Sequence, residues 1–255
     1  MSTNLSADVD AYEWARPWYT GKRVLVTGGT SGIGLAVARA FAAAGADVTG
    51  VGAFSHEIEA LGDKPVPADM RVLDVQDGEA IAGMMAGLDR LDVLVNCAGI
   101  IRRNDEHDPE VFAQVVDINL NGTMRMCASA RTLLAASSTG SIVNLASMLS
   151  IFGGGLVPGY AASKGGISQL TKSLAIAYAP DNIRVNAVAP GWIATPLTGT
   201  LRADEDRSQA ILSRTPLNRW GQPDDIAGAA LFLCSPAAAF ITGTTLAIDG
   251  GYSIA

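Results

Sequence analysis

Short, continuously apolar runs alternate along this chain with longer segments whose apolar residues recur at helical spacing. The run at 22–27 (KRVLVT) is β-branched and is followed by glycines, and the alanine-rich segment 34–45 ends in glycine, as helices often do. Residues 22–45 are therefore predicted to form a strand, a turn and a helix. Further strands are predicted at 47–51, 70–75, 91–96, 140–145, 183–189 and 244–248, and further helices at 80–88, 112–134 and 161–179.

Apolar strands that alternate with helices are typical of a parallel sheet whose two faces are both covered. We therefore expect an α/β fold, in which residues 1–255 form a single Rossmann-type, doubly wound domain around a seven-stranded parallel sheet. No low-complexity linker or internal repeat divides the chain. A polar, proline-bearing connection is expected at 62–69, between the second and third strands.

Two segments stand apart from this alternation. The N-terminal arm, residues 1–20, carries Trp14, Trp18 and Tyr19, and so many aromatic side chains predict that it packs on the body or on a neighbouring subunit. Residues 195–216 are polar and charged and follow the sixth strand. Because ligands of doubly wound sheets bind outside the carboxyl ends of the strands, this segment is predicted to be a substrate lid.

Composition and charge narrow the range of partners. Apolar residues make up 49% of the chain and charged residues 17%, which is sufficient for a buried core. The net charge of -7 provides no basic footprint for nucleic acid or an anionic membrane, so a small-molecule substrate is the expected partner. Cys97, Cys127 and Cys234 have no metal-ligand spacing, and the N-terminus lacks the basic and apolar regions of a signal peptide. These features predict a cytoplasmic protein without a metal site.

A glycine-rich turn joins the first strand to the first helix. Its sequence, TGGTSGIG at 27–34, allows the backbone to approach a pyrophosphate, and the helix N-terminus adds unpaired N–H groups and a partial positive charge. The predicted cofactor-binding residues of this turn are Gly28, Thr30, Ser31, Gly32, Ile33 and Gly34. A glycine-rich turn that holds no ligand is the alternative.

The ends of the next strands bear on the choice of cofactor. A dinucleotide site is expected to have an acid near the end of the second strand for the adenosine ribose, but GVGAF at 50–54 contains neither an acid nor an arginine. NAD and NADP both stay open, although the lack of a basic residue at 30–31 or 52–53 favours NAD. Further cofactor contacts are predicted at Asp74, Val75, Asn96, Ala98 and Gly99, at the ends of the third and fourth strands.

Tyr160 and Lys164 are four residues apart in a predicted helix and therefore share one face. Surface tyrosines that stack on lysine stems have the same spacing, so the spacing alone does not indicate a catalytic pair. Ser147, after the fifth strand, and Asn119, after the fourth, favour the catalytic interpretation. A free tyrosine has a pKa of about 10, whereas acid/base catalysis needs a pKa closer to the working pH. We expect the Lys164 ammonium and the positive ring of an oxidised nicotinamide to lower the pKa of Tyr160.

Five features together resemble the short-chain dehydrogenase/reductase family over essentially the whole chain. They are TGGTSGIG at 27–34, NCAG at 96–99, Ser147, YAASK at 160–164 and Pro190-Gly191. The resemblance implies that Tyr160 is the catalytic acid/base and that Lys164 lowers its pKa and holds the nicotinamide ribose. It also implies that Ser147 hydrogen-bonds the substrate oxygen and that Asn119 anchors a proton-relay water. Cys97 departs from the family, which has a second asparagine at that position.

The resemblance extends to the loop after the sixth strand and to the assembly. Pro190, Gly191, Ile193 and Thr195 match the family's loop beside the nicotinamide, and the last two are implied to contact the carboxamide. The family also implies a homotetramer. The apolar segment 240–255 would suit a subunit interface, or it is simply a buried last strand.

Four segments outside these motifs are similar to a sugar-acid branch of the family, the 2-dehydro-3-deoxy-D-gluconate 5-dehydrogenases. They lie at 98–103 (AGIIRR), 144–150 (NLASMLS), 201–212 (LRADEDRSQAIL) and 219–228 (RWGQPDDIAG). That branch oxidises or reduces a secondary alcohol of a sugar acid. The predicted substrate contacts are Arg102, Arg103, Ser147, Met148 and Tyr160.

The two arginines have two possible roles. Arg102 and Arg103 follow the fourth strand, where a guanidinium can clamp a carboxylate. Alternatively, they form a solvated basic pair that Asp105, Glu106 and Asp108 balance.

Three functions stay open. The first is an NAD-dependent dehydrogenase of sugar acids or polyols. The second is a 3-oxoacyl thioester reductase, which would favour NADP and a basic surface around the site. The third is a noncatalytic, dinucleotide-sensing scaffold, against which the complete set of Asn119, Ser147, Tyr160 and Lys164 argues.

Overall fold

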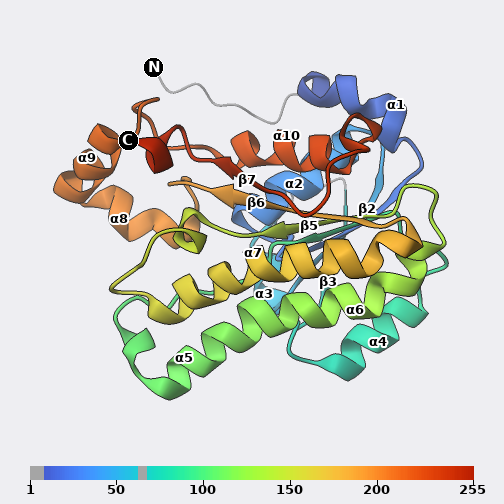
Figure 1. Ribbon diagram of the computed structural model, residues 1–255, viewed down its shortest axis with the longest axis horizontal. Helices are drawn as coiled ribbons and strands as arrows, with labels where there is room; N and C mark the ends of the chain where they lie inside the picture. Colours follow the sequence, from blue (N-terminus) through green and yellow to red (C-terminus); the bar gives the residue numbers. More distant parts are fainter. Residues whose placement is uncertain (1–8, 63–67) are drawn as a thin grey trace.

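Seven parallel strands form one sheet through the middle of the protein (Figure 1). The computed structural model describes residues 9–62 and 68–255. The strands are β1 Arg23–Thr27, β2 Asp47–Gly52, β3 Asp69–Val72, β4 Val93–Asn96, β5 Ser141–Leu145, β6 Arg184–Pro190 and β7 Thr245–Ile248. Their order is β3-β2-β1-β4-β5-β6-β7, so the winding direction changes between β1 and β4, where doubly wound sheets bind ligands. The predicted fold class and seven-stranded parallel sheet are confirmed.

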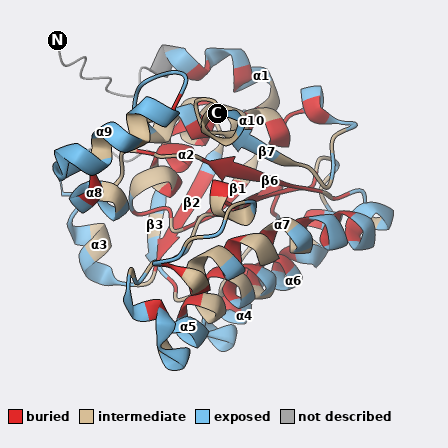
Figure 2. Ribbon diagram, turned by 60° about the vertical axis from the view of Figure 1, so that its left-hand side comes forward, coloured by how far each residue is buried: buried red, intermediate tan, exposed pale blue. Residues whose placement is uncertain are grey.

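Helices cover both faces of this sheet, and buried residues follow the strands and the inner helix surfaces (Figure 2). One face is covered by α2 (Gly32–Ala43) and α10 (Pro223–Cys234), and the other by α4 (Gly78–Ala86), α6 (Gly122–Ala135) and α7 (Pro158–Tyr178). Side chains alternate along each strand. Accordingly, Val24 and Val26 of β1 pack into the core under α2 and α10, while Leu25 packs into the core under α4, α6 and α7.

The helix predicted at 112–134 begins earlier and is interrupted. It begins at Pro109 because the Asp108 carboxylate accepts a hydrogen bond from the Glu110 amide at 2.8 Å, and proline suits the first helical position. A π-helical turn, Asp117–Asn121, separates α5 (Pro109–Val116) from α6. Such turns are frequent at functional sites, and this one contains Asn119.

Two of the helices that the sequence pattern misses are very short or rich in alanine, and the pattern extends one strand too far. The helix α3 (Ser55–Glu59) is too short to show a periodic pattern. The apolar residues of α10 include many alanines, which give little contrast between its two faces. The third strand ends at Val72 rather than 75, because its neighbour β2 ends at Gly52.

Residues 195–216 are largely helical. A 3-10 turn, Pro196–Thr198, is followed by α8 (Gly199–Ala203) and α9 (Glu205–Arg214). The Asp204 side chain caps α9 by accepting a hydrogen bond from the Arg207 amide at 3.1 Å. The role of this segment as a substrate lid stays a prediction.

The described part of the N-terminal arm packs on the body. It forms a 3-10 helix, Val9–Ala15, and α1 (Arg16–Tyr19). The buried Tyr19 ring lies edge-on to Phe41 of α2, with 4.9 Å between ring centroids, and its hydroxyl donates a hydrogen bond to the Leu231 carbonyl of α10. Residues 1–8 of the arm and 63–67 of the predicted connection lie outside the described residues.

The remaining connections contain short 3-10 turns. These are Asp105–His107, Met148–Ser150, Ala179–Asp181, Pro236–Ala238 and Tyr252–Ile254. Within 9–62 and 68–255, none of the helices combines the length and the apolar character that crossing a membrane requires.

Candidate active site

A cavity of about 420 Å³ opens at the carboxyl ends of β1, β2 and β4. It brings together most of the predicted cofactor residues: Gly28, Thr30, Ser31, Gly32, Ile33, Gly34, Asp74, Val75, Ala98, Gly99, Tyr160, Lys164 and Thr195. Residues that the sequence did not single out also line it, among them Phe54, Glu57, Gln76, Gln114, Ile118 and Leu197. The cavity therefore connects the glycine turn at one end with α7 at the other.

The glycine turn is too tight for side chains. Gly28 has a φ of +62°, and a Cβ there would lie 2.8 Å from the Ala98 nitrogen. A Cβ on Gly34 would lie 2.1 Å from the Gly28 carbonyl oxygen. Ser31, the N-cap of α2, makes no side-chain capping bond, so the first N–H groups of the helix need acceptors from outside. A dinucleotide phosphate is such an acceptor, and these residues fit it.

Tyr160 and Lys164 lie one turn apart on α7, with the Lys164 Nζ 5.5 Å from the centroid of the Tyr160 ring. The lysine side chain is 2% exposed, and its ammonium donates a hydrogen bond to the Leu145 carbonyl at the end of β5. Burial lowers the pKa of Lys164 to about 8.

The pKa of Tyr160 is raised rather than lowered. Burial of the phenol raises it most, the hydrogen bond with Ser147 opposes that effect, and the negative charge of Glu106 adds to it. Burial therefore disfavours the phenolate more than the protein surroundings favour it. The lowering of the pKa expected from Lys164 and an oxidised nicotinamide together stays a prediction.

Ser147 begins the turn that follows β5. Its Oγ accepts a hydrogen bond from the Leu149 amide at 3.1 Å. The Ser150 hydroxyl closes the turn and donates to the Lys164 carbonyl at 2.6 Å, which ties this loop to α7. The neighbouring Met148 is buried and does not line the cavity. Ser147 does not itself line the cavity, but it hydrogen-bonds Tyr160, which lines the cavity together with Lys164.

Asn119, the fourth predicted catalytic residue, is fully buried in the π-helical turn. Its Oδ1 accepts a hydrogen bond from the Ile100 amide at 2.8 Å, and its Nδ2 donates to the Ile100 carbonyl at 3.0 Å and to Ser163 Oγ at 3.1 Å. A Cβ on Gly99 would lie 3.2 Å from Asn119 Oδ1 and 3.8 Å from Lys164 Nζ, so this glycine separates the two side chains. Asn119 therefore braces the loop after β4 against α7.

The side chain of Asn96 does not line the cofactor cavity, and its predicted contact with the cofactor stays a prediction. It is buried on the sheet face covered by α6 and α7, where its Nδ2 donates to Asn144 Oδ1 at 2.9 Å and to Cys127 Sγ at 3.3 Å. Successive strand residues point to opposite faces, so the phase of the strand decides which residue meets a ligand. Cys97, the next residue, lines the cavity.

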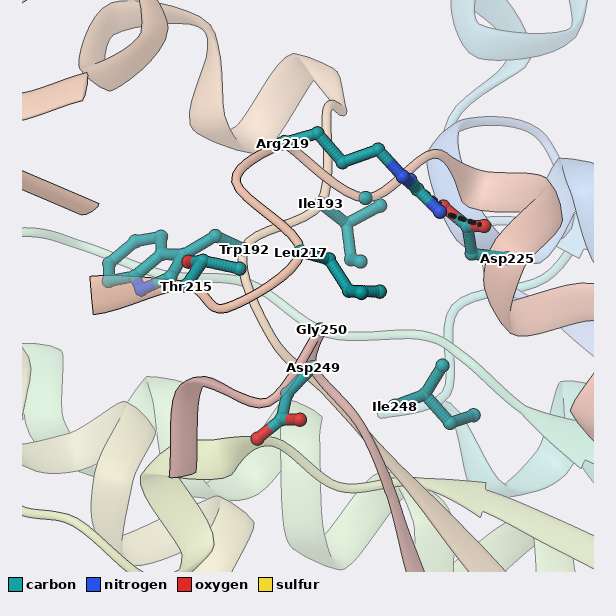
Figure 3. Close-up of a pocket in the computed structure, with 10 residues that line it drawn as sticks. Trp192, Ile193, Thr215, Leu217, Arg219, Asp225, Ile248, Asp249 and Gly250 are labelled. Atoms are coloured by element: carbon teal, nitrogen blue, oxygen red, sulfur yellow. Dashed lines mark hydrogen bonds and ion pairs between the residues drawn. The ribbon is translucent and has the colours of Figure 1, made fainter. Parts of the chain in front are cut away.

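Three further residues predicted beside the nicotinamide, Pro190, Gly191 and Ile193, do not line the main cavity either. Ile193 lines a separate cavity of about 140 Å³ behind the loop after β6 (Figure 3). There the loop is braced by Gly221, which accepts a hydrogen bond from the Ala194 amide at 2.8 Å and donates one to the Trp192 carbonyl at 2.9 Å.

A bidentate ion pair stands beside this brace (Figure 3). The Arg219 guanidinium donates to the two carboxylate oxygens of Asp225 at 2.6 and 2.8 Å. The Arg219 to Asp225 segment thus supports the loop that places Thr195 in the main cavity.

The two candidate substrate arginines differ in position. Arg102 lines the cavity that holds Tyr160 and Lys164, whereas Arg103 does not. Glu106 is not a solvated partner of this pair, because its carboxylate is buried and hydrogen-bonded to backbone N–H groups. That part of the solvated alternative is wrong.

Glu57 is the clearest residue that the sequence did not identify. Its Oε2 lies 3.2 Å from Thr30 Oγ1, and a Cβ on Gly52 would lie 2.5 Å from the same oxygen. A dinucleotide site is expected to have its ribose-binding acid at the end of the second strand, but residues 50–54 contain no acidic residue. Instead α3 turns back and brings a carboxylate to the end of β2 from five residues beyond Gly52.

Comparison with known proteins identifies the family. The family model described as "Enoyl-(Acyl carrier protein) reductase" matches residues 28–253. A "2-dehydro-3-deoxy-D-gluconate 5-dehydrogenase" from Bacillus subtilis strain 168 is 43% identical, covering 91% of this chain and 94% of the relative. The chain belongs to the short-chain dehydrogenase/reductase family. The resemblance inferred from its motifs is confirmed.

Other relatives agree with this assignment. A protein of the same name from Escherichia coli strain K12 is 40% identical, covering 91% of this chain and 95% of the relative. A solved gluconate 5-dehydrogenase from Burkholderia cenocepacia J2315, in complex with NADP and tartrate, is 34% identical with a TM-score of 0.87, covering 94% and 98% of the two chains. This short-chain dehydrogenase/reductase is therefore a nicotinamide-dependent enzyme acting on CH–OH groups rather than a noncatalytic scaffold.

Proposed function

We propose that this protein transfers a hydride between NAD and a secondary alcohol or ketone of a sugar acid, as a 2-dehydro-3-deoxy-D-gluconate 5-dehydrogenase does. The observation that carries the proposal is the meeting of Tyr160, its hydrogen-bond partner Ser147, and Lys164 at one end of a cavity that the glycine turn and Arg102 also line. The names of the relatives at about 40% identity support the substrate class.

In the proposed mechanism, Tyr160 moves the proton. A nicotinamide bound in the cavity supplies or accepts the hydride. In the reducing direction the phenol donates its proton to the substrate oxygen, and the raised pKa of Tyr160 keeps that proton in place at neutral pH. In the oxidising direction the phenolate must accept the hydroxyl proton, and the Lys164 ammonium favours that charge. Ser147 Oγ hydrogen-bonds the same substrate oxygen.

Asn119 has a supporting part in this mechanism. We infer that it anchors a proton-relay water between Lys164 and solvent, as the family resemblance implies. Its proximity to the ammonium across Gly99 supports this role.

Glu57 supports a preference for NAD over NADP. Its carboxylate lines the cavity beside Thr30 and Gly52, at the end of β2 where the adenosine ribose of a doubly wound fold is bound. A carboxylate can accept a hydrogen bond from a free ribose 2′-hydroxyl, but it repels a 2′-phosphate. The solved relative from Burkholderia cenocepacia carries NADP, so this chain's cofactor choice is proposed to differ from that neighbour's.

Arg102 supports an anionic substrate. Its guanidinium is at the cavity and is exposed. Among residues 9–62 and 68–255 it makes one weak hydrogen bond, to the Ile101 carbonyl at 3.4 Å, which leaves most of its donors for a ligand. Arg103, outside the cavity lining, has no such access in our proposal.

We propose that the enzyme is a cytoplasmic homotetramer. Free thiols at Cys97, Cys127 and Cys234 suit a reducing compartment. Phe240, Leu246 and Ile254 are exposed apolar side chains near the edge strand β7, and subunit contact would cover them. Light scattering coupled to gel filtration measures the assembly, and a monomer in solution would contradict the tetramer.

The experiment that tests the proposal is a spectrophotometric screen at neutral and alkaline pH. Sugar acids, neutral polyols and 3-oxoacyl thioesters are each offered with NAD(H) and with NADP(H). We expect the highest kcat/KM for a sugar acid with NAD(H). Turnover confined to acyl thioesters with NADPH would favour the thioester reductase instead, and Y160F run beside the wild type shows whether the turnover belongs to this site.

A further inference from the structure

A buried acidic side chain joins the loop after β4 to the helix that carries Tyr160. Glu106 lies in the 3-10 turn Asp105–His107 and is 1% exposed. One of its carboxylate oxygens accepts a hydrogen bond from the Arg102 amide at 2.8 Å, and the other accepts one from the Tyr160 amide at 2.7 Å. Both oxygens are therefore committed to the two segments that carry the proposed chemistry.

The helix α7 lacks a cap of its own. Its N-cap residue, Val157, has no polar side chain, and its first residue, Pro158, has no N–H group. The amide of Tyr160, the third residue, would otherwise lack an acceptor. Glu106 supplies that acceptor from 54 residues upstream, and its negative charge suits the positive end of the helix dipole.

Other contacts make this junction close-fitting. A Cβ on Gly159 would lie 3.3 Å from Glu106 Oε2 and 3.2 Å from Phe112 Cδ2. The Asn104 amide donates to the Leu156 carbonyl at 2.9 Å, and His107 Nε2 lies 2.9 Å from the Gly155 carbonyl oxygen. The loop after β4 is thus fastened to the segment before α7 at several points around Glu106.

We infer that Glu106 is a positioning residue for the reaction, which holds the start of α7, and with it the Tyr160 phenol, in place relative to Arg102. The carboxylate also adds a fixed negative charge to the surroundings of the phenol. The inference rests on the proposed role of Tyr160 as the acid/base.

The charged and titratable groups around the phenol fix the direction of the electrostatic effect. Lys164 faces it from α7 and Glu106 from the 3-10 turn, while Arg102 and Cys97 line the same cavity. Glu106 acts in the same direction as burial and raises the pKa of Tyr160, against the hydrogen bond from Ser147. Removing the charge of Glu106 should therefore make the phenol more acidic.

The test compares E106Q and E106D with the wild type. Glutamine keeps the size of the side chain but loses its charge, and its Nε2 cannot accept, so one backbone N–H loses its partner. In E106Q we expect kcat to fall about tenfold at unchanged cofactor Kd, and the midpoint of the pH profile for alcohol oxidation to move about 0.5 to 1 unit lower. E106D keeps the charge at a shorter reach, so kcat should fall while the midpoint stays at the wild-type value.

D108N is the matched control, because Asp108 is exposed, two residues away, and caps α5 rather than α7. It should keep the wild-type pH profile. Wild-type kcat and midpoint in E106Q, beside an inactive Y160F, would overturn the inference and leave the proposed function standing, whereas an active Y160F would overturn the proposed function. Should E106Q not fold, E106D decides: a lowered kcat at an unchanged midpoint supports the inference, and wild-type kcat refutes it.

Discussion

Side chains at the inner end of the cavity are buried and hydrogen-bonded, whereas those at its outer end are open to solvent and have few partners. Lys164 and Ser147 each bond to the protein and are held through β5 and α7. Phe54, at the other end, is 57% exposed, and Glu57 sits on the five-residue helix α3 beside the edge strand β3. Changes at the inner end should therefore alter the rate of reaction, and changes at the outer end the choice of cofactor.

The largest effect is expected for Y160F. Loss of the phenolic hydroxyl removes the proton donor and acceptor, so kcat should fall about 10²- to 10⁴-fold while the Kd for the cofactor changes little. Steady-state kinetics and fluorescence titration measure the two quantities. Y178F, on the same helix but outside the cavity, is the control and should keep nearly all activity. Normal turnover in Y160F would contradict the assignment of the reaction rate to the inner end of the cavity.

Lys164→Met should lower turnover and at the same time change how the free energy of unfolding depends on pH. Turnover should fall by a factor comparable to that of Y160F, because the lysine cation supports the phenolate. Burial lowers the pKa of Lys164 to about 8 in the folded protein. Between pH 8 and the pKa of this lysine in the unfolded chain, the unfolded chain therefore binds more protons than the folded protein does. The stability of the wild type should rise with pH across this window, by up to about 3 kcal/mol.

In Lys164→Met this rise is absent, so the free energy of unfolding of the variant relative to wild type should be higher at pH 7 than at pH 10. The Leu145 carbonyl, which loses its partner, offsets part of the gain at both values. Urea unfolding at the two pH values measures the difference. The exposed Lys172, on the same helix, is the control, and Lys172→Met should shift stability equally at both. A relative stability of Lys164→Met that is independent of pH would contradict the burial effect.

The sequence predicted the inner end of the cavity better than the outer end for a physical reason. Tyr160 and Lys164 belong to one helix, and the glycine turn is local, so spacing along the chain was sufficient. Glu106 caps a helix 54 residues away, and Glu57 reaches the site because a short helix turns back, so neither leaves a local pattern.

The fold shows the same division between local and long-range features. The alternation of strands and helices predicted the sheet, because each strand is a local apolar run. The face to which Asn96 points was not predictable, because VLVN is apolar throughout and gives no phase for the alternation of side chains. The π-helical turn at Asn119 has no pattern of its own inside a long helical segment.

Glu57→Gln tests the outer end. Without the carboxylate the repulsion of a 2′-phosphate disappears, while the neutral amide can still bond to a ribose hydroxyl. The ratio of kcat/KM for NADP to that for NAD should rise about tenfold, as expected for one charge interaction in a partly solvated site. Glu59→Gln, on the exposed side of the same helix, should leave the ratio unchanged. An equal rise in both variants would assign the effect to the overall charge rather than to Glu57.

The smallest effect is expected for Arg102→Ala, where the cavity meets the proposed substrate. Loss of the guanidinium should raise KM for an anionic sugar acid about three- to tenfold, since an exposed charge-assisted hydrogen bond contributes modestly, and should leave KM for a neutral polyol nearly unchanged. Arg103→Ala, whose side chain does not line the cavity, should affect neither substrate. Steady-state kinetics with both substrates gives the two ratios. Equal effects on the acid and the polyol would mean that Arg102 shapes the cavity without binding the carboxylate.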